Sequence, residues 1–294
     1  SRTMNPLSRF KYFTRREDYL AWLASPECQR ARRTVERPIS ELLARGGSHY
    51  IYCAAHRGHS PIGRGEESCI ESWNWRESAE CLSCGCITRI RFAAEWIERA
   101  CTNSIAPRLY VTEQLTPLYK ALIALTPSVV GSEFVPDPNE RAKASATLAA
   151  YLGNAQACIR HEDVCALSFA DESLDLIGSF DVLEHVPDYA RALTEFFRVL
   201  RVGGQLLLTV PFLNATNETL VRAQYVDGAL RHLAPPEYHG NPTITGEGVL
   251  CFYHFGWDLL DQLRTIGFRS VALLDVWGRE TAIFGDQNAI VATK

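Results

Sequence analysis

The sequence has no long apolar run and no large excess of charge of either sign. Its 294 residues are 47% hydrophobic and 22% charged, with a formal net charge of −4, which is ordinary usage for a globular protein. An apolar stretch of about 20 residues, as a membrane-spanning helix needs, is missing, and so are a secretory leader and an internal repeat. We therefore expect a cytoplasmic protein with no membrane partner, built from two domains or from one domain and an appendage.

The charge is unevenly distributed along the chain. Residues 1–106 carry 16 Lys and Arg against 12 Asp and Glu, and the remainder carries 14 against 22. Affinity for nucleic acids comes mainly from neutralised phosphates, so the acidic half does not suit a polyanion and we expect no nucleic-acid partner. The arginines between positions 30 and 45 leave that alternative open, although their helical spacing is typical of a solvent-exposed face.

Two helical patterns occur in the first 105 residues. The first spans residues 16–45 and is interrupted by Pro26 and Pro38, because proline ends or begins a helix. The second spans Arg91–Cys101, with apolar side chains on one face. The opposite face of that helix is charged, and we expect it to be exposed: Arg91, Glu95, Glu98 and Arg99.

Residues 46–86 are rich in Cys, His and Gly and poor in periodic apolar residues. Two pairs with two-residue gaps are separated by 24 residues: Cys53 with His56, and Cys81 with Cys84. This spacing is typical of two knuckles that close a zinc site, and disulfides are rare inside cells. We predict a structural zinc ion that replaces a core in this segment. The alternative is that the cysteines are buried as small hydrophobic side chains, and Cys69, Cys86 or His59 could substitute for one ligand.

From about residue 108 the chain alternates between strand and helix patterns. This alternation predicts an α/β fold with a doubly wound, Rossmann-like, mostly parallel seven-stranded sheet. The strands are expected at 108–112, 128–131, 157–160, 174–179, 205–210, 270–275 and 288–292, and the helices at 115–125, 141–152, 189–200 and 257–266. The connection 214–251 is long and rich in His, Tyr and Pro, so we interpret it as an insertion that covers the substrate.

The stretch 167–186 combines an acidic turn, an apolar strand and a polar strand end. It reads Leu-Ser-Phe-Ala-Asp-Glu-Ser-Leu-Asp, then Leu-Ile-Gly-Ser-Phe, then Asp-Val-Leu-Glu-His-Val. This stretch resembles the fourth-strand region of class I S-adenosylmethionine-dependent methyltransferases. A Gly-Gly turn and a strand ending in Val-Pro follow, as in that family. The resemblance covers residues 106–294 and implies S-adenosylmethionine as the cofactor, while residues 1–105 form a separate helical and Cys/His-rich region.

The resemblance fails at the turn after the first strand of the domain. The family usually has a Gly-x-Gly-x-Gly turn there, because the backbone approaches the cofactor closely. In this chain the turn reads Val-Thr-Glu-Gln-Leu-Thr-Pro and has no glycine. The resemblance then implies that Glu113 takes the acidic position, and that polar contacts to the cofactor come from Thr112, Gln114 and Thr116.

The other cofactor contacts implied by the resemblance follow the carboxyl ends of predicted strands, where ligands of open α/β sheets bind. Glu133, 20 residues beyond Glu113, matches the acidic residue that accepts hydrogen bonds from both ribose hydroxyls. Asp163 and Val164 match the pair at the adenine, with the acid on its amine and the apolar side chain on its ring. Three further residues would line the cofactor: Ser179, Phe180 and Asp181.

Methyl transfer requires an aligned acceptor and, when the acceptor is a hydroxyl, a group that takes its proton. Histidine is the usual choice because of its pKa. Four histidines lie in predicted loops of the carboxyl half. We rank His239 and His254 first as catalytic candidates, because both lie in aromatic, glycine-containing loops, and His185 next. Any one of them could instead be structural.

These features together predict an S-adenosylmethionine-dependent methyltransferase that acts on a small molecule or carbohydrate, at oxygen rather than at carbon or nitrogen. Two alternatives stay open. One is an RNA methyltransferase whose zinc module binds the nucleic acid. The other is a binding protein with the methyltransferase fold but without transfer activity, because the glycine turn is missing and fold alone does not establish chemistry.

Overall fold

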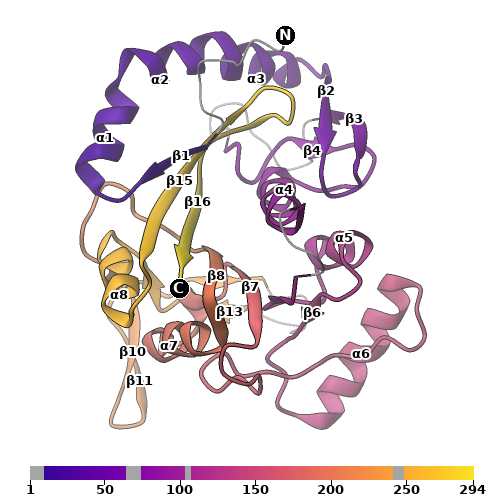
Figure 1. The fold of residues 1–294 in the computed structure, drawn as a ribbon, viewed down its shortest axis with the longest axis vertical. Coiled ribbons are helices and arrows are strands. Elements are labelled where there is room, and N and C mark those ends of the chain that lie inside the picture. Colours follow the sequence, from indigo (N-terminus) through magenta and orange to yellow (C-terminus); the bar gives the residue numbers. More distant parts are fainter. Residues whose placement is uncertain (1–9, 64–73, 103–106, 241–247) are drawn as a thin grey trace. The chain divides into compact units, whose positions relative to one another are not determined.

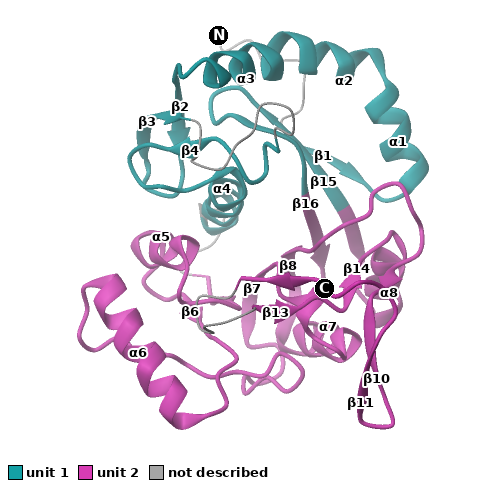
Figure 2. Ribbon diagram, turned by 180° about the vertical axis from the view of Figure 1, so that it is seen from behind, with its two compact units in different colours: residues 1–105, 273–287 teal, residues 106–272, 288–294 magenta. Residues whose placement is uncertain are grey.

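The computed structural model of the protein describes residues 10–63, 74–102, 107–240 and 248–294. The chain divides into two compact units, which are coloured separately in Figure 2. Unit 1 comprises Ser1–Ile105 and Leu273–Gln287, and unit 2 comprises Ala106–Ala272 and Asn288–Lys294. A hairpin near the carboxyl terminus therefore counts with the amino-terminal unit. Cys69, an alternative zinc ligand, lies outside the described residues.

The largest sheet has seven strands in the order β1-β15-β16-β8-β7-β5-β6 (Figure 1). Their bounds are Phe10–Phe13 for β1, Ser270–Gly278 for β15, Ile283–Thr293 for β16, Leu200–Thr209 for β8, Leu174–Phe180 for β7, Leu109–Val111 for β5 and Val130–Gly131 for β6. The strands β6, β5, β7 and β8 pair in parallel, and β16 and β1 pair antiparallel to β8 and β15. This sheet confirms the predicted α/β, Rossmann-like fold class.

One of the seven predicted strands is not formed, and another segment supplies the seventh strand. Residues 157–160 form no regular strand, and the pairing there is a single parallel bridge between Glu133 and His161. The side chain of Gln114 takes the backbone groups that a neighbouring strand would use: it donates to the carbonyl of Cys158 (3.3 Å) and accepts from the amide of Arg160 (2.7 Å). The seventh strand is instead β1, which the sequence pattern did not indicate.

Unit 1 contains a series of helices after β1: α1 (Arg16–Ala24), α2 (Pro26–Ala31), a π-helix (Arg32–Glu36) and α3 (Arg37–Ala44). They confirm the helical pattern of residues 16–45. Pro26 lies in the first turn of α2, where its missing N–H costs nothing, and Pro38 lies where the π-helix continues into α3. A three-stranded antiparallel sheet and a long helix follow: β2 (His49–Cys53), β3 (Gly58–Gly63), β4 (Glu80–Cys81) and α4 (Thr88–Thr102).

Helix α4 is not amphipathic in the predicted way, because Arg91 and Glu95 are buried, with exposed fractions of 1% and 5%. The Arg91 guanidinium donates to the carbonyls of Ala79 (3.1 Å) and Thr281 and to the Thr88 hydroxyl (2.9 Å). Burial lowers the pKa of Arg91, and the carbonyl oxygens stabilise its charge. Arg91 thus joins α4, the segment before β4 and the turn between β15 and β16.

Unit 2 contains the helices α5 (Pro117–Leu125), α6 (Pro138–Leu152), α7 (Tyr189–Val199) and α8 (Asp258–Ile266), and a short 3-10 helix, η3 (Leu183–His185). The four α-helices confirm the predicted ones. Polar side chains cap three of them: Thr116 accepts from the amide of Tyr119, Asp137 caps α6, and Asp188 accepts from the amide of Arg191. Such caps satisfy backbone amides that a helix start leaves unpaired.

The core of unit 2 covers both faces of the sheet. Leu206, Leu207 and Leu208 are consecutive residues of β8 and are all fully buried. Because successive side chains of a strand point to opposite faces, both faces of the sheet are packed. Helix α7 contributes the buried side chains of Leu193 and Phe196 to this core. Among the described residues, no helix combines the length and the apolar character that crossing a membrane requires.

The predicted insertion 214–251 contains short strand pairs rather than a plain loop. The antiparallel pairs are β10 (Ala223–Val226) with β11 (Ala229–His232), β12 (Tyr238–His239) with β13 (Val249–Leu250), and β9 (Leu220–Val221) with β14 (Tyr253–His254). Asp227 and Gly228 join β10 to β11, with positive φ angles of 51° and 78°. This is the conformation that an Asp-Gly hairpin turn favours.

Asp275 of β15 is a fully buried carboxylate in unit 1. Its Oδ2 accepts hydrogen bonds from the indole N–H groups of Trp22 (2.5 Å) and Trp277 (2.7 Å). Burial raises the pKa of Asp275 from 3.8 to about 6, and nearby Asp286 adds to this while Arg32 opposes it. The folded protein therefore holds this proton more tightly than the unfolded chain does.

We predict that the substitution Asp275→Asn stabilises the protein increasingly as the pH rises from about 4 to about 6. In the wild type the free energy of unfolding falls over this range, because the folded state must release the bound proton. The asparagine still accepts from both indoles and does not ionise. The stability gained by the variant should reach up to roughly 3 kcal/mol above pH 6, measured by urea unfolding at several pH values.

The matched control is Asp227→Asn, an exposed aspartate in a turn that asparagine also suits,. It should leave the pH dependence of unfolding unchanged. Parallel stability curves for the wild type and Asp275→Asn between pH 4 and 6 would contradict the prediction.

Candidate functional site

The carboxyl ends of the parallel strands β5, β6 and β7 lie at one edge of the sheet. Two predicted cofactor residues meet there, since the Thr112 hydroxyl donates to the Ser179 hydroxyl at 3.3 Å. Their exposed fractions are 8% and 1%. Phe180, also buried, ends β7. The structure thus brings together at this edge residues that are far apart in the sequence.

Glu133 follows β6 and holds the turn after β5. Its Oε1 accepts hydrogen bonds from the backbone amides of Gln114 (2.7 Å) and Leu115 (2.9 Å). Burial raises the pKa of Glu133, and these two hydrogen bonds offset part of the rise. No described residue hydrogen-bonds to Oε2 of Glu133. The turn that lacks the glycines of the family is therefore ordered by a carboxylate.

The other predicted residues of this turn differ in their surroundings. Gln114 is only 4% exposed and its amide is bonded to the backbone at residues 158 and 160. Thr116 caps α5, and Glu113 is partly exposed. The side chain of Gln114 is thus buried inside unit 2, whereas Glu113 is partly exposed to solvent.

Asp163 and Val164 follow the bridge between Glu133 and His161, and both are partly exposed. Oδ1 of Asp163 accepts from the backbone amide of Cys165 at 2.8 Å, an interaction that closes a tight turn. The predicted adenine pair therefore lies in a turn that follows His161, the bridge partner of Glu133, which is the residue predicted to bind the ribose.

Asp181 has a left-handed backbone, with a φ of 53°, directly after β7. Its amide donates to the carbonyl of Thr209 (2.9 Å), and its Oδ1 accepts from the Thr209 hydroxyl (3.1 Å). Non-glycine residues in this conformation cost energy and occur where the surrounding structure demands them. Here the two contacts with the end of β8 hold the turn that leads into η3.

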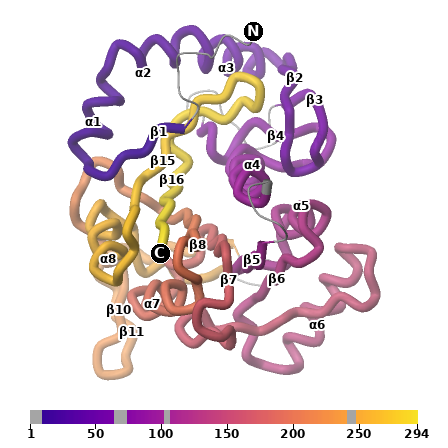
Figure 3. Tube along the Cα trace, in the orientation of Figure 1, coloured from indigo at the N-terminus to yellow at the C-terminus, as the bar shows by residue number. Residues whose placement is uncertain are grey.

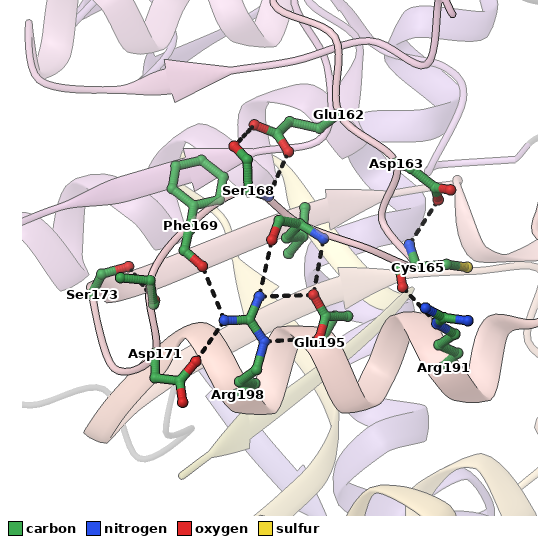
Figure 4. Close-up of polar contacts among 12 residues, drawn as sticks. Glu162, Asp163, Cys165, Ser168, Phe169, Asp171, Ser173, Arg191, Glu195 and Arg198 are labelled. Carbon is green, nitrogen blue, oxygen red and sulfur yellow. Dashed lines mark hydrogen bonds and ion pairs between the residues drawn. The ribbon is translucent and has the colours of Figure 1, made fainter.

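Figure 4 shows how the acidic turn before β7 is fixed to α7. Arg198 of α7 donates to the carboxylates of Asp171 (2.6 Å) and Glu195 (2.8 Å) and to the carbonyls of Phe169 (2.9 Å) and Leu167 (3.0 Å). The guanidinium suits such a set of acceptors because its donors form a planar fork. These contacts therefore hold the backbone of the acidic turn, which carries part of the family resemblance, in one conformation before β7.

Glu162 supports the same turn from the other side. It accepts from the Ser168 amide (2.9 Å), the Ser168 hydroxyl (2.5 Å) and the Arg160 side chain (2.8 Å). Burial alone would raise the pKa of Glu162, but these hydrogen bonds outweigh it and lower the pKa. Neither Glu162 nor Arg198 was identified from the sequence, because a charged residue gives no local signal of a distant partner.

The three histidines predicted as catalytic candidates lie close together. The rings of His185 and His239 are 4.9 Å apart and nearly perpendicular. The Oε1 atom of Glu237 accepts from Nε2 of His239 (2.9 Å) and from Nε2 of His254 (3.1 Å). The fourth candidate, His232, is exposed on β11. We call His185, His239, His254, Glu184 and Glu237 the histidine cluster.

Glu184 and Glu237 set the electrostatics of this cluster. Glu184 is fully buried, with its Oε1 3.7 Å from Nδ1 of His239 and 3.8 Å from Nε2 of His185. Glu184 and Glu237 raise the pKa of His239 to about 9, so this ring is protonated at neutral pH in the arrangement described. Both glutamates were overlooked in the sequence, although each lies within two residues of a predicted histidine.

The four predicted zinc ligands form a second cluster, in unit 1. The ligand atoms of Cys53, His56, Cys81 and Cys84 all lie within 4.8 Å of one another. Sγ of Cys53 is 3.8 Å from Sγ of Cys84, and Sγ of Cys81 is 3.6 Å from Nδ1 of His56. Tetrahedral zinc would place such pairs about 3.8 and 3.6 Å apart. The residues therefore fit a zinc ion with no open position.

Comparisons with known proteins point to one family for part of unit 2. Residues 113–208, from the turn after β5 to β8, match the family model of a methyltransferase domain. This segment contains Glu133, Asp163 and Asp181, and it contains Glu184 and His185 of the histidine cluster. The match lies in the region that the sequence resemblance indicated.

Two curated proteins are similar to parts of the chain. A "probable S-adenosylmethionine-dependent methyltransferase" of Mycolicibacterium smegmatis is 43% identical over 53 residues, 18% of this chain and 21% of its own length. An "uncharacterized methyltransferase" of Mycobacterium marinum is 33% identical over 122 residues, 40% of this chain and 45% of its own length. The chain therefore spans less than half the length of the curated relatives it matches.

Solved structures show only distant likeness. One from Thermotoga maritima, described as an S-adenosylmethionine-dependent methyltransferase, is 18% identical with a TM-score of 0.36. That match covers 70% of this chain and 91% of that one.

We predict that Gly131→Ala destabilises the turn after β5. A Cβ atom at Gly131 would lie 2.6 Å from the Glu113 carbonyl oxygen and 2.5 Å from the Tyr119 ring. The backbone oxygen can move only with the turn, so the hydrogen bonds to Glu133 would be strained. Overpacking of this kind costs about 1–3 kcal/mol, measured by urea unfolding.

Gly240→Ala provides the control, because no described atom lies within 4 Å of a Cβ built there. It should change the free energy of unfolding by less than about 0.5 kcal/mol. Equal destabilisation by the two substitutions would show that the close approach at Gly131 is unimportant.

Proposed function

We propose that this chain, with its methyltransferase domain, is an S-adenosylmethionine-dependent methyltransferase that acts on a hydroxyl of a small molecule or carbohydrate. The observation that supports it most is that predicted cofactor residues and two members of the histidine cluster, Glu184 and His185, follow the end of the same strand, β7. β7 ends in Phe180, and η3 directly beyond it holds Glu184 and His185. Proton transfer and cofactor binding would then occur side by side.

The residues at the sheet edge suit the cofactor in chemical character. Oε2 of Glu133 would accept from the ribose hydroxyls, while Oε1 keeps the turn after β5 in place. Asp163 and Val164 would contact the adenine, and Ser179, Phe180 and Asp181 would line the cofactor. Bound S-adenosylmethionine supplies a sulfonium methyl group. The protein's own task is then to orient the acceptor and to remove its proton.

The histidine cluster provides the proton acceptor for a hydroxyl substrate. Its three rings come from η3, β12 and β14, so they converge from separate segments around Glu184 and Glu237. Carboxylates that hold histidine rings in position are typical of acid-base sites. A nitrogen or carbon acceptor would have less need of such a group, which is why we propose oxygen.

We also propose that Cys53, His56, Cys81 and Cys84 bind a structural zinc ion. Four protein ligands leave no position for a substrate, so the ion stabilises unit 1 and takes no part in transfer. Three thiolates and Zn²⁺ carry one net negative charge, and the thiols lie close enough to Arg91 to interact with its charge. A buried arginine beside the ion would balance that charge.

The cofactor assignment predicts the effect of Glu133→Gln on the binding of S-adenosylhomocysteine. The glutamine oxygen still accepts from the backbone of Gln114 and Leu115, so the turn should persist. The loss of the charged acceptor for the ribose should weaken binding about tenfold or more, measured by isothermal titration calorimetry.

Glu140→Gln is the matched control, since Glu140 is exposed on α6 and pairs with Lys143. It should bind the ligand as the wild type does. Absence of heat and of a thermal shift with the wild type at millimolar ligand would refute the methyltransferase proposal. Binding together with salt-dependent affinity for RNA would favour the RNA-methyltransferase alternative.

The zinc proposal predicts that protein prepared without added metal contains tightly bound zinc that depends on Cys84. The substitution Cys84→Ser should remove about one equivalent, whereas Cys158→Ser, at an exposed cysteine outside the cluster, should remove none. Because the metal replaces a core in this segment, Cys84→Ser should also lower the thermal stability. Less than about half an equivalent of zinc in the wild type would count against the site.

A further inference from the structure

Glu184 is a buried acid without a hydrogen-bond partner among the described residues. Its side chain is 0% exposed, and both Oε1 and Oε2 lack a hydrogen bond. The imidazoles of His185 and His239 face Oε1, but at 3.8 and 3.7 Å, beyond hydrogen-bond distance. A carboxylate in such a place is stabilised by a nearby cation, because removing a charge from water is costly.

Both histidines direct one ring nitrogen at Glu184, and a metal ion would displace the proton that Nδ1 of His239 carries at neutral pH,. The Nδ1–H of His185 donates to the carbonyl of Leu250 at 2.8 Å, which leaves Nε2 without a proton in the neutral ring. The Nε2–H of His239 donates to Glu237 at 2.9 Å, which leaves Nδ1 facing Glu184. Metal-binding histidines are held in this way, with the second ring nitrogen bonded to a carboxylate or a backbone carbonyl.

We propose that Glu184 Oε1, His185 Nε2 and His239 Nδ1 bind a divalent metal ion. The three residues offer ligand atoms within 4.8 Å of one another. A metal about 2.1 Å from each atom would set them about 3.0–3.4 Å apart, so the observed 3.7 and 3.8 Å need to shorten by a few tenths of an ångström. Two imidazoles and one carboxylate leave positions open for a substrate and suit Mn²⁺, Fe²⁺ or Zn²⁺ better than Mg²⁺.

Glu237 acts on this site as a positioning residue. It accepts from His239 and His254 through Oε1, and Arg222 contacts its Oε2 at 3.1 Å. Its charge is therefore already balanced by the protein. The neighbouring group of Glu237, Cys251 and His254 is thus a hydrogen-bonded support rather than a second metal site.

The metal site deepens the proposed function and, in its role in transfer, rests on it. Open positions on the metal would bind two adjacent oxygens of the acceptor and lower the pKa of the hydroxyl. The acceptor oxygen forms a bond to the methyl carbon as the carbon–sulfur bond breaks, sulfur keeps the electron pair, and His254 takes the hydroxyl proton. The acceptor class is therefore a compound with neighbouring oxygens, such as a vicinal diol.

The test is a titration with Mn²⁺, in the absence of cofactor, of the 294-residue protein freed of weakly bound metal but with the zinc of unit 1 retained. Mn²⁺ prefers oxygen and nitrogen ligands and competes poorly for the thiolates in unit 1. We expect one equivalent to bind to the wild type, measured by calorimetry and by electron paramagnetic resonance. Glu184→Gln and His239→Gln should bind more than 100-fold more weakly, and Glu237→Gln about 10–100-fold more weakly.

His232→Gln is the matched control, as an exposed histidine on β11, and should bind Mn²⁺ normally. Unchanged affinity in Glu184→Gln, or no binding by the wild type, would overturn the inference. Thermal unfolding checks each variant, and if Glu184→Gln does not fold, His185→Gln and His239→Gln decide. Binding of S-adenosylhomocysteine is measured separately, so its absence beside an intact Mn²⁺ site would refute the proposed function alone.

Discussion

The hydrogen bonds that Glu133 accepts from the backbone of Gln114 and Leu115 hold the region on which the rest of unit 2 depends. They place the turn after β5 against β6, and Gly131 leaves room for that approach. Once the turn is there, the Gln114 side chain reaches the backbone at residues 158 and 160, in place of a regular strand. A carboxylate thus orders a turn that the resembled family usually builds with glycines.

Elements defined by local pattern were predictable from the sequence. The helices of unit 2 could be predicted, because apolar periodicity and polar capping residues such as Asp188 identify them. The proximity of Cys53 and Cys84 could also be predicted, because the spacing of the Cys/His pairs is typical of a metal-binding cluster. β1 could not be predicted, since four residues paired with a strand from the other end of the chain give no periodic signal. The burial of Arg91 and of Glu184 could not be predicted, because a charged side chain is expected to be exposed unless its distant partners are known.

Each unit contains a buried charge that the fold compensates in a different way. In unit 1, backbone carbonyls surround Arg91 and indole N–H groups bond to Asp275. In unit 2, Arg198 binds exposed and half-buried carboxylates around the turn before β7. Glu184 differs from these, because the described protein atoms offer it no donor. The other charged groups bond to donors or acceptors within the protein, whereas Glu184 does not. This difference is why we infer that Glu184 binds a ligand.

The strands β15 and β16, the yellow end of the chain in Figure 3, each belong partly to unit 1 and partly to unit 2. Residues 273–287 complete unit 1, yet they are synthesised after almost all of unit 2. At roughly 5–20 residues per second on the ribosome, β1 and Arg91 wait about ten to fifty seconds for their partners,. Unit 2 also needs residues 288–294, so neither unit completes its fold before the carboxyl-terminal strands are synthesised, and β1 and Arg91 lack their partners until then.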